Sequence, residues 1–123
     1  MSVLTAIAVP EIGKLLDRIR VRGAVGDIQS LFSAARHLAI ARSAQSTVEI
    51  DTARRTIYVS VGIDTVRTRE IGAEHDVRLS ASRVRMSYSP TGIGYGAANL
   101  SVVVRRSAAV DTVFVSRLGR VRH

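Results

Sequence analysis

The sequence predicts an α+β protein in which one long N-terminal helix precedes an antiparallel β-sheet. Apolar residues between positions 12 and 39 recur at spacings of three and four, which is the period of an amphipathic helix. After Arg42 the period changes to two, as in a strand with one buried face. Several short strands then follow without another long helix, which favours an antiparallel sheet. We therefore expect a helical region over 1–44 and a globular β domain over 45–123.

The predicted helix is longer than a domain of this size requires, because at ~1.5 Å per residue it would extend roughly 60 Å. The stretch 3–9 is apolar on all sides apart from Thr5, unlike an ordinary surface helix. Pro10 lies inside the pattern, where a proline is expected to kink a helix. Gly23 and Gly26 predict either a local bend or a seam between two functional halves. We infer that the N-terminal end is buried against another molecule.

Residues 1–9 would cover about 13 Å as a helix, whereas the hydrocarbon core of a membrane is ~30 Å thick. The sequence as it stands therefore does not span a membrane, and no basic segment precedes the apolar run as in a signal peptide. We expect the full-length gene product to begin upstream of Met1, with further apolar residues encoded in frame. The alternative is a soluble protein that buries this end in a partner.

The β domain is expected to hold six or seven short strands, wrapped against the C-terminal half of the helix. Alternation over 48–50 and 57–61, with a turn at 51–54, predicts a hairpin. Charged residues in a third strand over 65–71 are typical of a sheet edge. Further strands are predicted from Val77, over 84–88, over 100–104 and over 110–116, with 120–122 as a short continuation. The glycine-rich segment 89–96 is interpreted as a turn serving a hairpin.

Charge is concentrated in the C-terminal third of the chain. The 123 residues carry a formal net charge of +8 and no cysteine, so thiol chemistry and disulfides are excluded. Residues 78–123 hold eight arginines against Asp111 alone, whereas residues 1–77 are nearly balanced. Arginine favours bidentate contacts with phosphate, so a polyanionic partner is one interpretation of this excess. A solvated arginine surface is the other.

No catalytic set is visible in the sequence. His37, His75 and His123 have neither a second histidine nor a carboxylate at metal-ligand spacing, so neither a metal site nor a cofactor is expected. His75, between Glu74 and Asp76, is predicted to be a solvated loop residue. The glycine-rich segment is followed by a predicted strand and not by the helix that a phosphate-binding loop requires. No serine lies in a G-x-S-x-G nucleophile elbow.

Three stretches of the chain resemble the type IV pilin-like subunits of the GspH/FimT group. They are the A-x-P sequence Ala8-Val9-Pro10, the helical run from Leu31 to Arg42, and the closing Gly-Arg-x-Arg sequence at Gly119-Arg120-Val121-Arg122. The resemblance covers nearly the whole chain. It departs from the family at the front, where the processing site and the first apolar turns are absent from the sequence.

The resemblance implies a non-enzymatic minor pilin or pseudopilin with a long helix packed on a β domain. Its partners would be other pilins or pseudopilins in a filament, and the inner membrane through the complete helix, with the β domain in the periplasm or on a pilus. The resemblance does not distinguish a subunit of a type II secretion system from a subunit of a type IV pilus. The expected filament-packing residues are Val3, Leu4, Ile7, Pro10, Ile12, Leu15, Leu16 and Ile19.

A second implication is DNA binding without sequence specificity, as the Gly-Arg-x-Arg motif is associated with DNA uptake in the FimT branch. The residues that would carry it are Arg117, Gly119, Arg120 and Arg122. Because the chain has only three tyrosines, we expect contacts with phosphates to dominate over base stacking. A soluble enzyme without a recognisable site is the remaining alternative.

Overall fold

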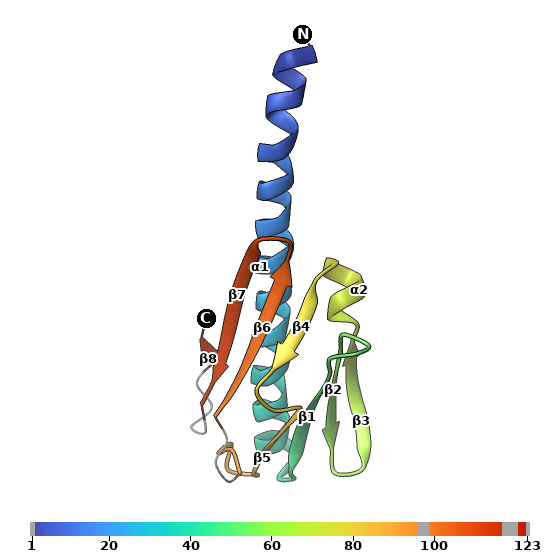
Figure 1. Ribbon diagram of the computed structural model, residues 1–123. Coiled ribbons are helices and arrows are strands. Elements are labelled where there is room, and N and C mark those ends of the chain that lie inside the picture. The colour runs from blue at the N-terminus through green and yellow to red at the C-terminus, as the bar shows by residue number, and fades with distance from the viewer. Residues whose placement is uncertain (1, 96–98, 117–120, 123) are drawn as a thin grey trace.

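The computed structural model describes residues 2–95, 99–116 and 121–122, with side chains described from Glu11 onward. One long helix, α1 (Ser2–Arg42), forms the axis of the molecule, and the strands lie along its C-terminal half (Figure 1). The helix continues without interruption through Pro10 and through Gly23–Gly26. It ends at Arg42, where Ser43 takes a left-handed conformation with φ 49° and the Ala44 N–H bonds the Ala39 carbonyl at 3.1 Å. The predicted α+β fold, a long N-terminal helix followed by antiparallel strands, is confirmed.

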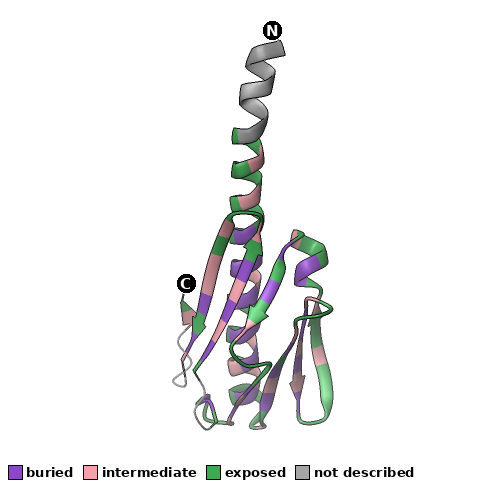
Figure 2. Cartoon of the chain, in the orientation of Figure 1, coloured by how far each residue is buried: buried purple, intermediate pink, exposed green. Residues whose placement is uncertain are grey.

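One face of α1 is buried only from its middle onward. The fully or nearly fully buried helix residues follow the predicted spacing: Val21, Ala24, Val25, Ile28, Leu31, Phe32, Ala35 and Ala39. Small residues alternate with large ones on this face, which lets the strands approach the helix closely. Figure 2 shows the buried band along the lower part of the helix and the exposed turns above it. Further apolar residues, Ile12, Leu15, Leu16 and Ile19, precede the covered part of the helix. At about 100° per residue they lie on the side of α1 opposite to the buried face.

The first sheet contains β1 (Ser46–Asp51), β2 (Thr56–Val61), β3 (Asp64–Arg69) and β5 (Arg85–Tyr88) in the order β3-β2-β1-β5. Its described pairings are all antiparallel. The predicted hairpin is β1–β2, with Val48 opposite Val59 and Ile50 opposite Ile57, and all four side chains are buried. The third predicted strand is β3, which lies at the sheet edge as its charges indicated.

The second sheet contains β4 (Arg78–Ala81), β6 (Leu100–Arg106), β7 (Ala109–Val115) and β8 (Val121–Arg122) in the order β4-β6-β7-β8. Its strands are also antiparallel. The expected single sheet of six or seven strands was therefore wrong, because the described residues form eight strands in two four-stranded sheets. The chain changes sheet after Ala81, since β4 pairs with β6 whereas β5 pairs with β1.

Two further details differ from the prediction. Ile71, expected at the end of the third strand, begins a five-residue helix, α2 (Ile71–His75), and is fully buried. The glycine-rich segment folds back in a tight antiparallel turn, with Tyr88 bridged to Gly94 and the Gly92 N–H donating to the Ser89 carbonyl at 2.8 Å. It does not pair β5 with β6, which belong to different sheets. Instead, the Arg36 Nε donates to the Gly92 carbonyl at 3.1 Å, which fastens this loop to α1.

Tyr88 occupies the centre of the packing between helix and sheets. Its side chain is completely buried, and burial raises the pKa of its hydroxyl to about 12, although the Arg36 charge opposes this rise. Among the described residues, the Tyr88 hydroxyl is the buried side-chain polar atom that lacks a hydrogen-bond partner. Such an orphaned group destabilises the folded state.

Candidate functional site

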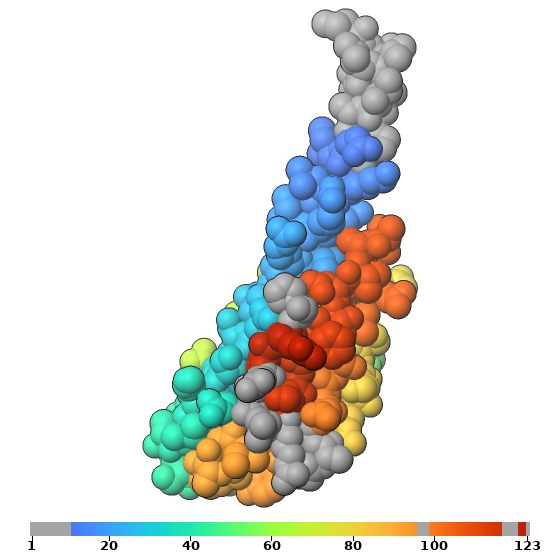
Figure 3. Space-filling view, turned by 90° about the vertical axis from the view of Figure 1, so that its left-hand side faces the viewer, coloured from blue at the N-terminus to red at the C-terminus, as the bar shows by residue number. Residues whose placement is uncertain are grey.

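The exposed part of α1 presents an apolar surface that we call the helix face, made of Ile12, Leu15, Leu16 and Ile19. Their exposed fractions are 62%, 52%, 40% and 57%, respectively. Figure 3 shows these turns of the helix, in blue, projecting above most of the β domain, with the orange end of the domain reaching their lower part. Four large apolar side chains grouped on one short surface are typical of an interaction site. The other predicted packing residues, Val3, Leu4, Ile7 and Pro10, lie outside the described side chains.

An ion-pair network joins the β domain to α1 within the span of the helix face, at Asp17. The Arg106 Nε donates to Asp17 Oδ1 at 2.7 Å, and its Nη1 donates to Asp76 Oδ2 at 2.5 Å and to the Asp76 carbonyl at 3.0 Å. The hydrogen bonds that Arg106 donates to Asp17 and Asp76 raise the pKa of its guanidinium. This arrangement ties the end of β6 and the turn after α2 to the helix at Asp17, between Leu16 and Ile19 of the helix face.

A second ion-pair network, ten residues further along α1, also joins the helix to the β domain. Arg69 of β3 donates to Asp27 Oδ2 at 2.8 Å and to Glu74 Oε2 at 2.5 Å. The hydrogen bond from Arg69 lowers the pKa of Glu74. His75 Nε2 lies 2.6 Å from the same Asp27 oxygen. We call Asp27, Arg69, Glu74 and His75 the Asp27 cluster.

The interpretation of His75 as a solvated loop residue was wrong. His75 lies in α2 and its side chain is only 21% exposed. Its ring rests against Gly23, where a Cβ would come within 3.1 Å of Nδ1, so a glycine at this position permits the contact. The presence of Gly23, a poor helix former in the middle of α1, is therefore explained by its contact with a residue 52 positions further along the chain.

Asp27, Glu74 and His75 bring three potential metal ligands within 4.8 Å of one another. Sequence spacing did not show this group, because the fold brings its members together from α1 and α2. Arg69 donates hydrogen bonds to both carboxylates, and its guanidinium charge would repel a cation at the same place. The arrangement is therefore explained as an ion-pair network that fastens α2 to the helix.

The candidate DNA-binding residues are only partly described, since Arg117, Gly119 and Arg120 lie outside the described residues. Arg122 is placed on β8, directly opposite Phe114 of β7, which in turn lies opposite Ser101 of β6. Phe114 is 48% exposed, whereas its neighbours Val113 and Val115 are buried. The row Ser101–Phe114–Arg122 therefore lies on the outer face of the second sheet, away from the helix.

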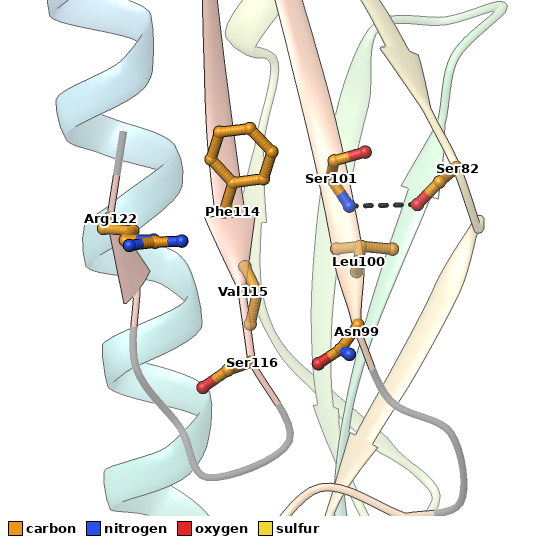
Figure 4. A pocket seen from close by; sticks show the side chains of 8 residues that line it. All are labelled: Ser82, Asn99, Leu100, Ser101, Phe114, Val115, Ser116 and Arg122. Carbon is orange, nitrogen blue, oxygen red and sulfur yellow. Dashed lines mark hydrogen bonds between the residues drawn. The ribbon is translucent and has the colours of Figure 1, made fainter.

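A pocket of about 560 Å³ opens along this row. Figure 4 shows its lining, which comprises Ser82, Asn99, Leu100, Ser101, Phe114, Val115, Ser116 and Arg122. The Arg122 guanidinium carbon lies 5.9 Å from the centre of the Phe114 ring, which is within cation–π range. The pocket thus combines a cation, an exposed aromatic ring and several neutral hydrogen-bonding groups. The sequence prediction considered tyrosines and overlooked Phe114, although strand alternation places it opposite to the buried valines.

No family model matches this chain, and no curated protein matches it by sequence. Solved structures do match. The type IV minor pilin FimU of Pseudomonas aeruginosa strain PAO1 gives a TM-score of 0.73 at 10% identity, covering 85% of this chain and 88% of that one. A second crystal form of FimU gives a TM-score of 0.68 at 9% identity, covering 82% of this chain and 90% of that one.

The minor pseudopilin EpsH from the type 2 secretion system of Vibrio cholerae also matches, with a TM-score of 0.64 at 9% identity over 84% of this chain and 94% of that one. At such identities the likeness concerns the fold. Within the described part of the chain, no helix is long and apolar enough to cross a membrane. The long helix and the antiparallel sheets packed along it therefore give this chain a pilin-like α+β fold.

Proposed function

We propose that this chain is a non-enzymatic minor pilin or pseudopilin, which assembles into the filament of a type IV pilus or a type II secretion system through α1. The observation that carries the proposal is the helix face, which lies beyond the β domain and exposes four large apolar side chains. The likeness in fold to both a minor pilin and a minor pseudopilin supports it and leaves both systems open. The subunit would be held at the inner membrane through its N-terminal helix before assembly, with the β domain in the periplasm or on a pilus.

The mechanism of assembly is apolar burial. Burying a large aliphatic side chain contributes about 1.5–3 kcal/mol relative to leaving it in water. Packing Ile12, Leu15, Leu16 and Ile19 against apolar helices of neighbouring subunits would therefore offset much of the entropic cost of association. The ion pairs at Asp17 and Asp27 fix the β domain on α1, so the domain would take a defined orientation whenever the helix is packed.

Replacing Leu15 with aspartate tests this role, because it puts a charge into the proposed interface. We expect the parent chain to self-associate in sedimentation velocity experiments and the Leu15→Asp variant to shift toward the monomer. Ile63→Asp is the matched control, since Ile63 is 99% exposed on the turn between β2 and β3. A parent chain that sediments as a monomer, or an equal shift in both variants, would contradict the proposal.

DNA binding is the second candidate function, and the contact between Arg122 and Phe114 favours it. An exposed ring beside a guanidinium can stack on a base while the charge meets a phosphate. The pocket beside them adds neutral donors and acceptors that would contact the sugar–phosphate backbone. Binding of this kind would show little sequence preference and would weaken with salt.

Double replacement of Phe114 and Arg122 by alanine should weaken binding to single-stranded DNA of any sequence. Fluorescence anisotropy should also show a shallower salt dependence, by roughly 0.7 in log–log slope for each phosphate that the variant no longer neutralises. Arg67→Ala is the control, because Arg67 is exposed on β3 in the other sheet. Arg69 is unsuitable as a control, since it fastens Asp27 and Glu74. Equal weakening in the variant and the control would leave only the role in assembly.

A further inference from the structure

A groove at the upper end of the second sheet gathers arginines from three separate segments of the chain. Its lining comprises Arg55, Asp76, Val77, Arg78, Arg105, Arg106 and Ser107, and its volume is about 710 Å³. Figure 1 places α2, the start of β4 and the turn between β6 and β7 at the end of the domain from which α1 emerges. This arginine groove is separate from both the helix face and the pocket beside Phe114.

The charges in the arginine groove are not balanced. Asp76 is the single acidic residue of its lining, and it is already paired with Arg106. Arg55 donates to the Val77 carbonyl at 3.1 Å, which carries no charge to neutralise it. Within the part of the chain that the structure describes, Arg55, Arg78 and Arg105 have no carboxylate partner. Three guanidinium groups thus face one concavity, and their charge is only partly offset by the Arg106 network, in which Asp17 and Asp76 share one arginine.

Two of these arginines are placed where they repel each other. Arg78 of β4 lies directly opposite Arg105 of β6, and both side chains are exposed on the same face of the sheet. Directly opposite residues in an antiparallel pair have Cβ atoms about 4.5–5.5 Å apart, and like charges there destabilise the pairing. An anion bound between them would convert this repulsion into attraction.

The backbone around the arginine groove is also unusual. Arg55, Asp76 and Ser107 have positive φ angles of 54°, 53° and 52°, and they make up three of the four such non-glycine residues described. For an arginine this conformation is uncommon and costs free energy. Hydrogen bonds hold two of the three segments in place. The Gly72 N–H donates to the Arg55 carbonyl at 2.9 Å, and the Arg106 Nη1 donates to the Asp76 carbonyl at 3.0 Å. The backbone that carries Arg55 and the backbone that precedes Arg78 are thus held by hydrogen bonds.

We propose that the arginine groove binds a phosphate group. Guanidinium forks match the oxygens of phosphate in bidentate geometry, and a phosphate monoester carries roughly −1.5 to −2 charge at pH 7, suited to three unpaired cations. The groove is compact, with its cations converging from three segments, which favours a single phosphate group over an extended polyanion track. Free phosphate offers these oxygens with the higher charge, whereas the phosphodiester of an anionic lipid headgroup offers two non-bridging oxygens and one negative charge. The experiment below distinguishes these two sources.

Isothermal titration of the full chain with inorganic phosphate, at constant ionic strength set by chloride, tests the site. We expect saturable binding by the parent, and the Arg105→Gln variant should bind at least about tenfold more weakly, as expected on removal of one charged hydrogen-bond partner. Arg67→Gln removes the same charge from the opposite sheet and should bind as the parent does. Arg105→Gln should also melt at a temperature equal to or above that of the parent in phosphate-free buffer, because the repulsion with Arg78 is relieved.

The phosphate site is refuted if the parent shows no saturable binding, or if Arg105→Gln and Arg67→Gln weaken binding equally. It is also refuted if the Arg105→Gln variant weakens binding to duplex DNA but changes binding to neither phosphate nor vesicles. Co-sedimentation with phosphatidylglycerol vesicles assigns the source of the phosphate. Weaker co-sedimentation of Arg105→Gln but not of Arg67→Gln identifies the lipid headgroup, and equal binding of all three chains identifies a soluble phosphate. None of these measurements involves the helix face. The proposed role in assembly is therefore tested independently of the phosphate site.

Discussion

At the scale of single residues, the most informative features are the ion pairs that join α1 to the β domain. Asp17 and Asp27 are acidic residues of a helix that is otherwise rich in arginine, and each pairs with an arginine supplied by a strand. Both pairs are partly shielded from water, so they are screened less than fully exposed ones. They hold the β domain in one position along the helix, one within the span of the helix face and one ten residues further on.

Replacing Asp27 with asparagine should destabilise the protein, because Asp27 accepts hydrogen bonds within a cluster that also contains Arg69 and His75. The expected decrease in the free energy of unfolding is about 1–2 kcal/mol, which is typical of a charged hydrogen-bond partner in a partly buried site. Urea denaturation measures it. Asp64→Asn is the control, since Asp64 is exposed at the start of β3. Equal stability of the two variants would show that the Asp27 cluster contributes nothing to folding.

Tyr88 makes a prediction about alkaline pH. Its pKa is raised to about 12 in the folded state, whereas an unfolded tyrosine ionises near pH 10. The unfolded chain therefore releases this proton first, so the stability contributed by Tyr88 is complete below pH 10 and is lost as the pH rises toward 12. In Tyr88→Phe this component of the pH dependence should vanish, and stability at pH 7 should be unchanged or higher because the hydroxyl lacks a partner. Urea titrations of both chains between pH 8 and 11 should diverge; parallel curves would contradict the assigned burial.

At the scale of elements, α1 has two parts with different roles. From Val21 onward its apolar residues are buried by the two sheets, whereas the helix face before that point stays exposed. The border lies between Ile19 and Val21, and Asp17 already reaches across it to Arg106. A truncation that removes residues 1–22 would therefore delete a buried valine and an ion pair along with the helix face.

Removal of residues 1–16 deletes three of the four helix-face residues and leaves Ile19 in place. We expect the shortened chain to remain folded, because its buried residues and both ion-pair networks are retained. It should sediment as a monomer, whereas the full chain should self-associate. Circular dichroism and sedimentation velocity together check this. If the shortened chain is unfolded while the full chain is a stable monomer, the helix face would belong to the core and not to an interface.

The α2 helix shows how one residue can decide the position of an element. At Gly72 an added Cβ would overlap the Cβ of Arg55 on the turn between β1 and β2, so only glycine allows α2 to pack there. Gly72→Ala should therefore displace α2 and weaken the contacts of His75 with Asp27. Thermal denaturation should show a lower melting temperature than in Ala73→Gly, a control in the same helix that creates no overlap. A melting temperature at or above that of the control would contradict this packing.

At the scale of the whole molecule, the sequence predicted the helix and the β1–β2 hairpin well, because both rest on local periodicity. It could not predict that residues 77–88 divide between two sheets, since strand partners are chosen by packing far along the chain. The five residues of α2 are too few for a helical period to show. The ion pairs of Asp17 and Asp27 join positions 89 and 42 residues apart, so no local pattern reveals them. The exposure of Phe114 could have been predicted, because strand alternation places it on the side opposite to the buried Val113 and Val115.

The molecule as a whole divides its surface into three regions with different chemistry. The helix face is apolar, the pocket beside Phe114 combines an aromatic ring with one cation, and the arginine groove is strongly basic. The helix face lies on the helix beyond the domain, whereas the two others lie on the second sheet. Packing of α1 among neighbouring helices would therefore leave both basic regions on the part of the subunit that faces outward.

The most direct test of assembly through α1 uses single cysteines, which is possible because the chain has none of its own. A photo-cross-linking reagent is attached to the thiol of Ile19→Cys, or to that of Ile63→Cys as the control, and the protein is then allowed to assemble. We predict covalent products joining subunits from position 19 and not from position 63, since Ile19 lies on the helix face and Ile63 on a turn of the β domain. Products of equal yield from both positions, or from position 63 alone, would contradict assembly through the helix.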